Sequence, residues 1–240
     1  MNAAVLVTGT RDVWPEVHFG VPPQKVEWRS LAVLEQVRLP LPESVWTELE
    51  SRKREWVVFS SPRAVRFWTE ALLESGQELA VETRVACVGE RTALAAEADG
   101  YTVDFCPREA GSEGFLQGFL EILGSDKQSF LLPAARGGRE MLRETLARLG
   151  HDVLALELYE SVPSASIDSS LRKAEWDKAR AIVFTSPSSA DAVLSRMPLP
   201  KHLQVVAMGN YTGASLRSHG LAQPALLPAS DLARLGEVLQ

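Results

Sequence analysis

The chain contains two copies of one short pattern, and this repeat restricts the folds that are available to it. Residues 57 to 65 read VVFSSPRAV and residues 182 to 190 read IVFTSPSSA. A second apolar run follows in both copies, VACVGERTALAAEADG at 85 to 100 and VVAMGNYTGASLRSHG at 205 to 220, with glycines at matching positions. The sequence therefore predicts two versions of one structural unit.

Each copy is predicted to fold as strand, helix, strand, helix. Short continuous apolar runs are typical of strands that are buried on both faces of a parallel sheet. Ser61 and Ser186, each followed by proline, combine an N-cap hydroxyl with a proline at the first helical position. Gly100 and Gly220 are placed to end the second helices. Because open α/β sheets bind ligands at the carboxyl ends of their strands, we expect two such edges to face each other across a cleft.

The N-terminal segment supplies strands that the C-terminal copy lacks. Residues 57 to 158 read as five strands alternating with helices, whereas the second copy has room for three strands before the chain ends. Residues 4 to 11 superpose on 130 to 138, so that Arg11 corresponds to Arg136. We therefore predict a discontinuous α/β domain of residues 1–36 and 168–240, an inserted α/β domain of residues 42–158, and linker strands at 37–41 and 159–167.

Composition narrows the class of protein. With 240 residues, 45% hydrophobic and 23% charged, the chain is long enough for two globular cores. A formal net charge of −6 argues against nucleic acid or an anionic membrane as a partner. The first residues lack the pattern of a signal peptide, so we expect a cytoplasmic protein. Cys87 and Cys106 are expected to be free thiols, and the four scattered histidines suggest no metal site.

Several segments, taken in order, resemble the uroporphyrinogen-III synthase family. They are the FSSPRAV and FTSPSSA turns, VACVGERTA, VAMGNYTGASL, LLPAARGGREMLRETLARLG and LELYESVP. One motif alone has low specificity, but their order and spacing over most of residues 56 to 240 are specific. The resemblance implies two flavodoxin-like, doubly wound parallel-sheet domains joined by a two-stranded linker, with the active cleft between them.

The resemblance also implies a cofactor-free reaction of tetrapyrrole and heme biosynthesis. Hydroxymethylbilane loses its terminal hydroxyl as water, ring D is attacked at its substituted carbon, and a spiro intermediate rearranges to uroporphyrinogen III with ring D inverted. Without control the bilane closes to the uninverted isomer, so orientation matters more than acid–base chemistry. A monomer that receives its substrate from hydroxymethylbilane synthase is the matching expectation for partners.

Candidate site residues follow from the family motifs. Tyr159 matches a family tyrosine proposed to assist loss of the hydroxyl, and an ordinary packed tyrosine is the alternative. Thr92 and Thr212 match family threonines at the cleft, and capping of their own helices is the alternative. The serines could equally be helix caps and the arginines could equally face solvent. Further candidates for binding substrate carboxylates are Arg11, Ser61, Arg63, Arg136, Arg139, Ser186 and Ser188.

Backbone amides are expected to complete the site. The N-terminus of a helix attracts anions through its free N–H groups and its dipole. The substrate is a polycarboxylate, and its recognition by backbone donors needs no particular side chain. The helix N-termini predicted around the cleft are at residues 61–63, 89–92, 136–139, 186–189 and 209–212.

The N-terminus departs from the family pattern. Family members usually follow the first strand with Arg-Pro and an amphipathic helix, whereas Asp12 follows Arg11 here and a proline-rich stretch extends to Gln24. This departure supports one alternative, a synthase-like protein that binds a tetrapyrrole or another polyanion without turnover. A second alternative is a two-domain receptor resembling periplasmic binding proteins, which the small size and the missing signal peptide disfavour.

Overall fold

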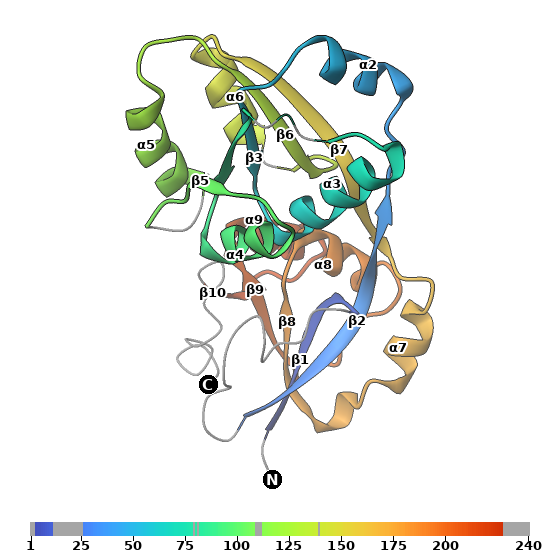
Figure 1. Cartoon of the computed structure of the whole chain (residues 1–240). Helices are drawn as coiled ribbons and strands as arrows, with labels where there is room; N and C mark the ends of the chain where they lie inside the picture. Colours follow the sequence, from blue (N-terminus) through green and yellow to red (C-terminus); the bar gives the residue numbers. More distant parts are fainter. Residues whose placement is uncertain are drawn as a thin grey trace. The chain divides into compact units, whose positions relative to one another are not determined.

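The computed structural model (Figure 1) describes residues 3–11, 26–78, 80, 82–108, 112–138 and 140–227. The chain divides into two compact units. Unit 1 comprises Met1–Gln36 with Ser161–Gln240, and unit 2 comprises Val37–Glu160. The strands within each unit are parallel, and helices lie between most of the consecutive strands that the structure describes. The predicted α/β class is therefore confirmed.

Unit 2 is a doubly wound sheet with the strand order β7-β6-β3-β4-β5. Numbered along the chain from β3, the order is 3-2-1-4-5, whereas flavodoxin has 2-1-3-4-5. The likeness to flavodoxin therefore lies in the layers and not in the order of the strands. The chain reverses direction across the sheet between β3 and β6, which makes this pair the topological switch point. The strands are β3 (Trp56–Phe59), β4 (Arg84–Cys87), β5 (Val103–Phe105), β6 (Ser129–Ala135) and β7 (Asp152–Pro163).

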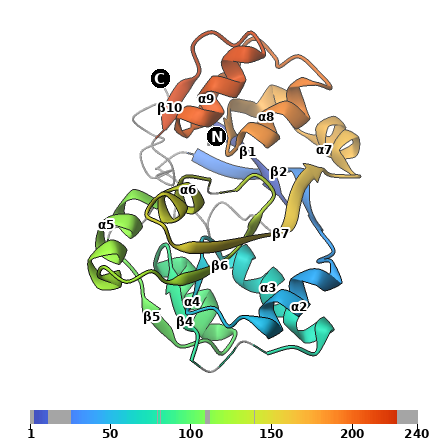
Figure 2. The ribbon, with the colours of Figure 1, turned by 90° about the horizontal axis from the view of Figure 1, so that it is seen from above.

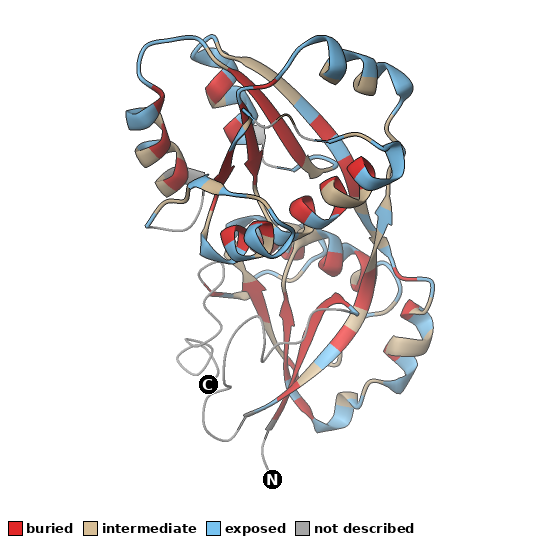
Figure 3. Ribbon diagram, viewed as in Figure 1, coloured by how far each residue is buried: buried red, intermediate tan, exposed pale blue. Residues whose placement is uncertain are grey.

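Helices cover both faces of the unit 2 sheet (Figure 2). On one face α2, α3 and α4 pack against Val57, Phe59 and Leu131. On the other face Phe115 and Phe119 of α5, with two leucines of α6, pack against residues of β3 and β6. The strands β3, β4 and β6 are accordingly buried along most of their length (Figure 3). The helices are α2 (Glu43–Ser51), α3 (Pro62–Ser75), α4 (Glu90–Ala98), α5 (Ser112–Leu123) and α6 (Glu140–Arg148).

Unit 1 has the strand order β10-β9-β8-β1-β2, which repeats that of unit 2. The N-terminal strand β1 pairs in parallel with β8, with Val5 opposite Ala181. The core on one face joins α7, α8 and α9 to the sheet through residues such as Ile182 and Phe184. The elements are β1 (Ala3–Thr10), β2 (Val26–Arg38), α7 (Ile167–Lys173), the 3-10 helix η1 (Trp176–Lys178), β8 (Ala179–Phe184), α8 (Pro187–Leu194), β9 (Gln204–Met208), α9 (Gly209–Ser218) and β10 (Ala225–Leu227).

The predicted signals at the helix ends are confirmed. Ser61 and Ser186 are N-caps in extended conformation, and each accepts a hydrogen bond from the amide three residues later. Gly100 and Gly220 have φ values of 90° and 85°, a left-handed conformation that glycine adopts without strain. The serine-proline pairs therefore start the first helix of each repeat, and these glycines end the second.

The segment after β6 differs from its prediction. The sequence predicts a helix N-terminus at residues 136–139, but β6 continues to Ala135 and α6 begins at Glu140. Between them Gly137 has φ 66°, and the Gly138 amide donates to the Ala135 carbonyl at 2.9 Å. Arg136 therefore lies directly after the end of β6 and not at the start of a helix. The helix N-terminus predicted at 136–139 is wrong in position.

Some predictions fall outside the described residues. These are the atypical stretch from Asp12 to Gln24 and the candidate Arg139. Within the described ranges, no helix is both long and apolar enough to cross a membrane.

Candidate active site

The carboxyl ends of β3 and β7 bring two predicted site residues together in unit 2. The Tyr159 hydroxyl lies 3.2 Å from Ser61 Oγ, and either atom can be the donor. Ser61 Oγ also accepts the Ala64 amide at 3.1 Å. The Tyr159 ring is buried and stacks on Phe67 with ring centroids 4.6 Å apart. The tyrosine hydroxyl is thus fixed at the N-terminus of α3, beside the switch point of the sheet.

Arg136 stands at the same edge, but its charge is already balanced. Its backbone amide donates to the Tyr159 carbonyl at 2.7 Å, which extends the pairing of β6 with β7. Its guanidinium donates to Glu157 at 3.2 Å and to Glu160 at 2.7 Å. The hydrogen bond to Glu157 and the charge of Glu160 raise the pKa of Arg136 above its ordinary value. A substrate carboxylate would therefore have to compete with two carboxylates of the chain itself.

Thr92 and Thr212 are buried in the first turns of α4 and α9, with 5% and 2% of their surface exposed. The N-cap residues of these helices are Gly89 and Met208, and neither N-terminus has a side-chain cap. The interpretation of the threonines as capping residues is therefore wrong. Without a capping side chain, the amides of the first turn remain directed at the carboxyl edge of the sheet.

The two uncapped N-termini differ in their acidic residues. The first turn of α4 contains the acidic Glu90, whereas the first turn of α9 contains no acidic residue. A carboxylate at this position already complements the helix dipole. The start of α9 therefore has no acidic side chain that would compete with an external anion.

In unit 1 the corresponding switch point, between β8 and β1, is closed by a network of hydroxyl groups. Ser186 and Ser189 form a capping box, with both bonds at 3.2 Å. Thr8 Oγ1 donates to Ser189 Oγ at 2.9 Å, and Thr185 Oγ1 donates to the Thr8 carbonyl at 2.8 Å. Thr8 and Ser189 are fully buried. Ser186 is thus a structural cap, while the neighbouring Ser188 is exposed.

Sequence reasoning missed this network because Thr8 and Ser189 are 181 residues apart in the chain. A threonine in an otherwise apolar strand is the only local signal. The sequence analysis also did not single out Tyr211, which lies in the first turn of α9 and is 87% exposed. An aromatic side chain so exposed beside an uncapped helix N-terminus is a candidate for stacking on a planar ring of a ligand.

The remaining predicted arginines have different surroundings. Arg11 is exposed at the end of β1, and its Nη2 donates to Ser166 Oγ at 3.4 Å. Arg63 is half-buried in the first turn of α3. Within the described residues, Arg11 therefore keeps most of its donors for an anionic ligand on the unit 1 edge.

The described part of the chain shows neither a cluster of metal ligands nor a cysteine activated as a nucleophile. No group of three or more His, Cys, Asp or Glu side chains there could hold a metal ion. Cys87 and Cys106 are free thiols. Burial raises the pKa of Cys87 to about 12 and also raises the pKa of Cys106. Neither cysteine is activated as a thiolate nucleophile at neutral pH.

A sequence model of the family described as Uroporphyrinogen-III synthase HemD matches residues 30–228. The chain belongs to the uroporphyrinogen-III synthase family. The uroporphyrinogen-III synthase of Chlorobaculum parvum is 28% identical over 192 residues, which cover 75% of this chain and 76% of that protein. The uroporphyrinogen-III synthase of Synechococcus elongatus is 29% identical over 164 residues, covering 65% of this chain and 61% of that protein.

Solved structures of the family share the fold. The uroporphyrinogen-III synthetase of Helicobacter pylori matches 99% of this chain and 100% of its own, with a TM-score of 0.66 at 18% identity. A Thermus thermophilus uroporphyrinogen III synthase matches 99% of this chain and 96% of its own, with a TM-score of 0.59 at 19% identity. The family resemblance and the α/β fold predicted from the sequence are thus confirmed.

Proposed function

We propose that this chain is a uroporphyrinogen-III synthase, a cyclising lyase of tetrapyrrole biosynthesis that acts on hydroxymethylbilane. The observation that carries the proposal is the family match over residues 30–228, which includes both copies of the repeat. The reaction needs no cofactor, because the pyrrole nitrogens of the bilane themselves drive the departure of hydroxide. The protein has to fix the orientation of ring D.

The carboxylates of the bilane are proposed to bind at the uncapped starts of α4 and α9. Both N-termini lack a side-chain cap, so their amides can donate to an external anion. Thr92 and Thr212, which are buried in the same helices, are proposed to hold the first turns in position. Arg11 and Ser188, both exposed at the carboxyl edge of unit 1, add side-chain donors there.

Tyr159 is proposed to donate its proton to the departing hydroxyl. The geometry provides a directed chain of donors: the Ala64 amide donates to Ser61 Oγ, and the Ser61 hydroxyl can in turn donate to Tyr159. In that arrangement the tyrosine proton is free to point at the substrate. The positive end of the α3 dipole and the hydrogen bond from Ser61 both stabilise the negative charge that develops on the phenolic oxygen.

The proposal extends to partners and location. The enzyme is a monomer in the cytoplasm and takes hydroxymethylbilane from hydroxymethylbilane synthase. Since the free bilane closes spontaneously to the uninverted isomer, rapid capture by the cyclising enzyme favours the inverted product.

Turnover must be distinguished from binding alone. Freshly generated hydroxymethylbilane is mixed with the purified, folded full chain, and the oxidised products are resolved into isomers I and III, with heat-denatured protein as the control. A synthase gives predominantly isomer III, while the control gives isomer I. A protein that only binds tetrapyrroles would slow the loss of linear bilane and give no isomer III.

A further inference from the structure

The two cysteines of the chain lie at the carboxyl ends of neighbouring strands in unit 2. Cys87 is the last residue of β4, and Cys106 directly follows β5, which ends at Phe105. The two strands pair in parallel, with Ala86 opposite Phe105. The next residue along each strand is a cysteine, so this register places Cys87 beside Cys106.

Both thiols project from the same face of the sheet. Successive side chains of a strand point to opposite faces. Ala86 belongs to the core on the α5 and α6 face, and Phe105 packs against that core. Cys87 belongs to the core on the α3 and α4 face, and Cys106 packs against it. The two cysteine side chains therefore share one apolar environment.

The spacing of the strands suits a disulfide bond. Neighbouring strands lie about 4.8 Å apart, and the Cα atoms of a disulfide are usually about 4.4–6.8 Å apart. Burial raises the pKa of Cys87 to about 12 and the charge of Cys106 contributes, so the thiols lie within electrostatic range of each other. Cys106 Sγ makes a weak hydrogen bond of 3.8 Å to the Pro107 carbonyl, which leaves its side chain free to rotate toward Cys87.

The two thiols differ in their access to solvent. Cys87 is fully buried, whereas Cys106 is partly exposed. An oxidant from solvent therefore reaches Cys106 first, and Cys87 is positioned to react with it from within the protein. Burial and the charges of Glu90 and Glu97 raise the pKa of Cys106. Because little thiolate is present at neutral pH, oxidation is slow, which suits a response to sustained oxidation and not rapid thiol catalysis.

We propose that Cys106 and Cys87 form an oxidative modification site, which a hydroperoxide converts to an intramolecular disulfide. With hydrogen peroxide, the Cys106 sulfur attacks one oxygen, the O–O bond breaks, and water leaves a sulfenic acid on Cys106. The Cys87 sulfur then displaces the hydroxyl of this sulfenic acid, which takes up the Cys87 proton and leaves as a second water. The thiol pair loses two electrons and two protons, and the peroxide is reduced to two waters.

The site is reversible and independent of the proposed synthase reaction. An external thiol can attack the exposed sulfur of Cys106 and restore both cysteines. In a reducing compartment such a bond is transient, as is usual for redox-sensing disulfides. The bond ties β5 to the end of β4, two residues before Gly89, the N-cap of α4.

Peptide mapping of the oxidised full chain tests the proposal. The folded protein is treated with excess hydrogen peroxide, denatured, alkylated with iodoacetamide and digested with trypsin. Cleavage after Arg84, Arg91 and Arg108 places the cysteines in separate peptides, VACVGER and TALAAEADGYTVDFCPR. We expect most of the monomer to contain these two peptides joined by a bond that dithiothreitol breaks. Two alkylated cysteines, a sulfinic acid on Cys106 without a joined peptide, or a bond between two chains would overturn the proposal.

Two variants test the order of the steps. Cys87→Ala leaves the sulfenic acid of Cys106 without a thiol partner, so dimedone should capture it about fivefold more than in the original chain. Cys106→Ser leaves Cys87 buried, and Cys87 should remain a thiol at the same peroxide dose. Equal capture by dimedone in the original chain and Cys87→Ala, or oxidation of Cys87 in Cys106→Ser, contradicts the proposed order.

Two internal controls keep the test decisive. Met141 is 44% exposed, and its conversion to the sulfoxide shows that every protein received the same peroxide dose. If Cys87→Ala fails to fold because Cys87 lies in the core, Cys106→Ser changes a partly exposed position and still tests the pair. Oxidation of Cys87 in this folded variant would then contradict the proposal.

Discussion

At the scale of single residues, the hydrogen bond between Tyr159 and Ser61 is the contact on which the proposed chemistry depends. Tyr159→Phe keeps the stacking on Phe67 and removes the bond to Ser61. We expect the free energy of unfolding to fall by about 1 kcal/mol and isomer III to form about tenfold more slowly, without total loss. Urea unfolding and single-turnover assays measure the two effects.

Tyr101 offers a matched control for Tyr159. Its hydroxyl forms a similar bond, 3.1 Å from Thr69 Oγ1, at the other end of the sheet. Tyr101→Phe should cost a similar free energy of unfolding, about 1 kcal/mol, with turnover unchanged. If both variants lose turnover equally, Tyr159 acts through stability and the proposed proton donation is wrong.

Thr92 and Thr212 test how far the site relies on backbone donors. Thr212→Val and Thr92→Val keep the buried volume and remove one hydroxyl each, while the first-turn amides remain in place. Each variant should form isomer III severalfold to about tenfold more slowly. Thr47→Val, on the exposed surface of α2, should change nothing. Complete loss of activity with an intact fold in either buried variant would contradict the role given to the backbone.

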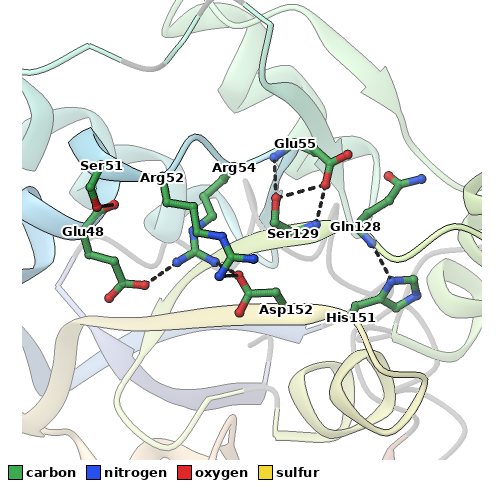
Figure 4. Close-up of polar contacts among 9 residues, drawn as sticks. All are labelled: Glu48, Ser51, Arg52, Arg54, Glu55, Gln128, Ser129, His151 and Asp152. Atoms are coloured by element: carbon green, nitrogen blue, oxygen red, sulfur yellow. Dashed lines mark hydrogen bonds and ion pairs between the residues drawn. The ribbon is translucent and has the colours of Figure 1, made fainter.

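His151 predicts a pH dependence of stability. Burial lowers its pKa below the ordinary 6.5, and its Nδ1 accepts the Gln128 amide at 3.2 Å, which requires that nitrogen to be unprotonated (Figure 4). The unfolded chain therefore binds the proton more readily than the folded chain. Stability should be fully retained above the ordinary pKa and fall as the pH decreases below 6.5 toward the folded-state value.

His151→Asn tests this sign. The asparagine oxygen can replace Nδ1 as an acceptor without titrating. Urea midpoints at pH 7.5 and 5.5 should differ less in the variant than in the original chain. An equal pH dependence in both proteins would show that His151 does not cause the loss of stability.

Only part of the candidate site could be predicted at this scale. Ser61 and Tyr159 were predicted separately from motifs, but their contact joins residues 98 apart in sequence. The balance of Arg136 by Glu157 and Glu160 likewise depends on the strand end where Arg136 lies. Such contacts come from the pairing of distant strands, which a local pattern does not contain.

At the scale of helices and strands, the capped and uncapped helix starts have different roles. Ser186→Ala removes the N-cap and one half of the capping box of α8. We expect the free energy of unfolding to fall by about 1 kcal/mol. Ser188→Ala, at an exposed position outside the capping box, should change it by less than about 0.5 kcal/mol. Equal losses in the two variants would refute the assignment of Ser186 as the cap.

Most elements could be predicted because their signals are local. The serine-proline pairs predicted the starts of α3 and α8, and Gly100 and Gly220 predicted the ends of α4 and α9. The apolar runs predicted the strands beside these helices. The helix start after β6 was misplaced, because the alanine and arginine at 135 and 136 are compatible with a helix. The pairing of β6 with β7, which includes the Arg136 amide, overrides that preference.

At the scale of the whole molecule, the repeat explains why one short chain presents two similar sheet edges. Both units have the same strand order, so each brings a serine-capped helix start and an uncapped one to the carboxyl ends of its strands. The division into a discontinuous and an inserted domain could be predicted only by assigning β1 and β2 to the second copy. The positions of domain boundaries and linkers stay a prediction.

The most direct test of the proposed function is the fraction of isomer III as a function of enzyme concentration. Spontaneous closure to isomer I competes with the catalysed reaction, so a fixed amount of hydroxymethylbilane reports which path is faster. The proposed synthase predicts that isomer III rises from a negligible share to nearly all of the product as enzyme is added. A product that remains isomer I at every concentration of folded protein would contradict it.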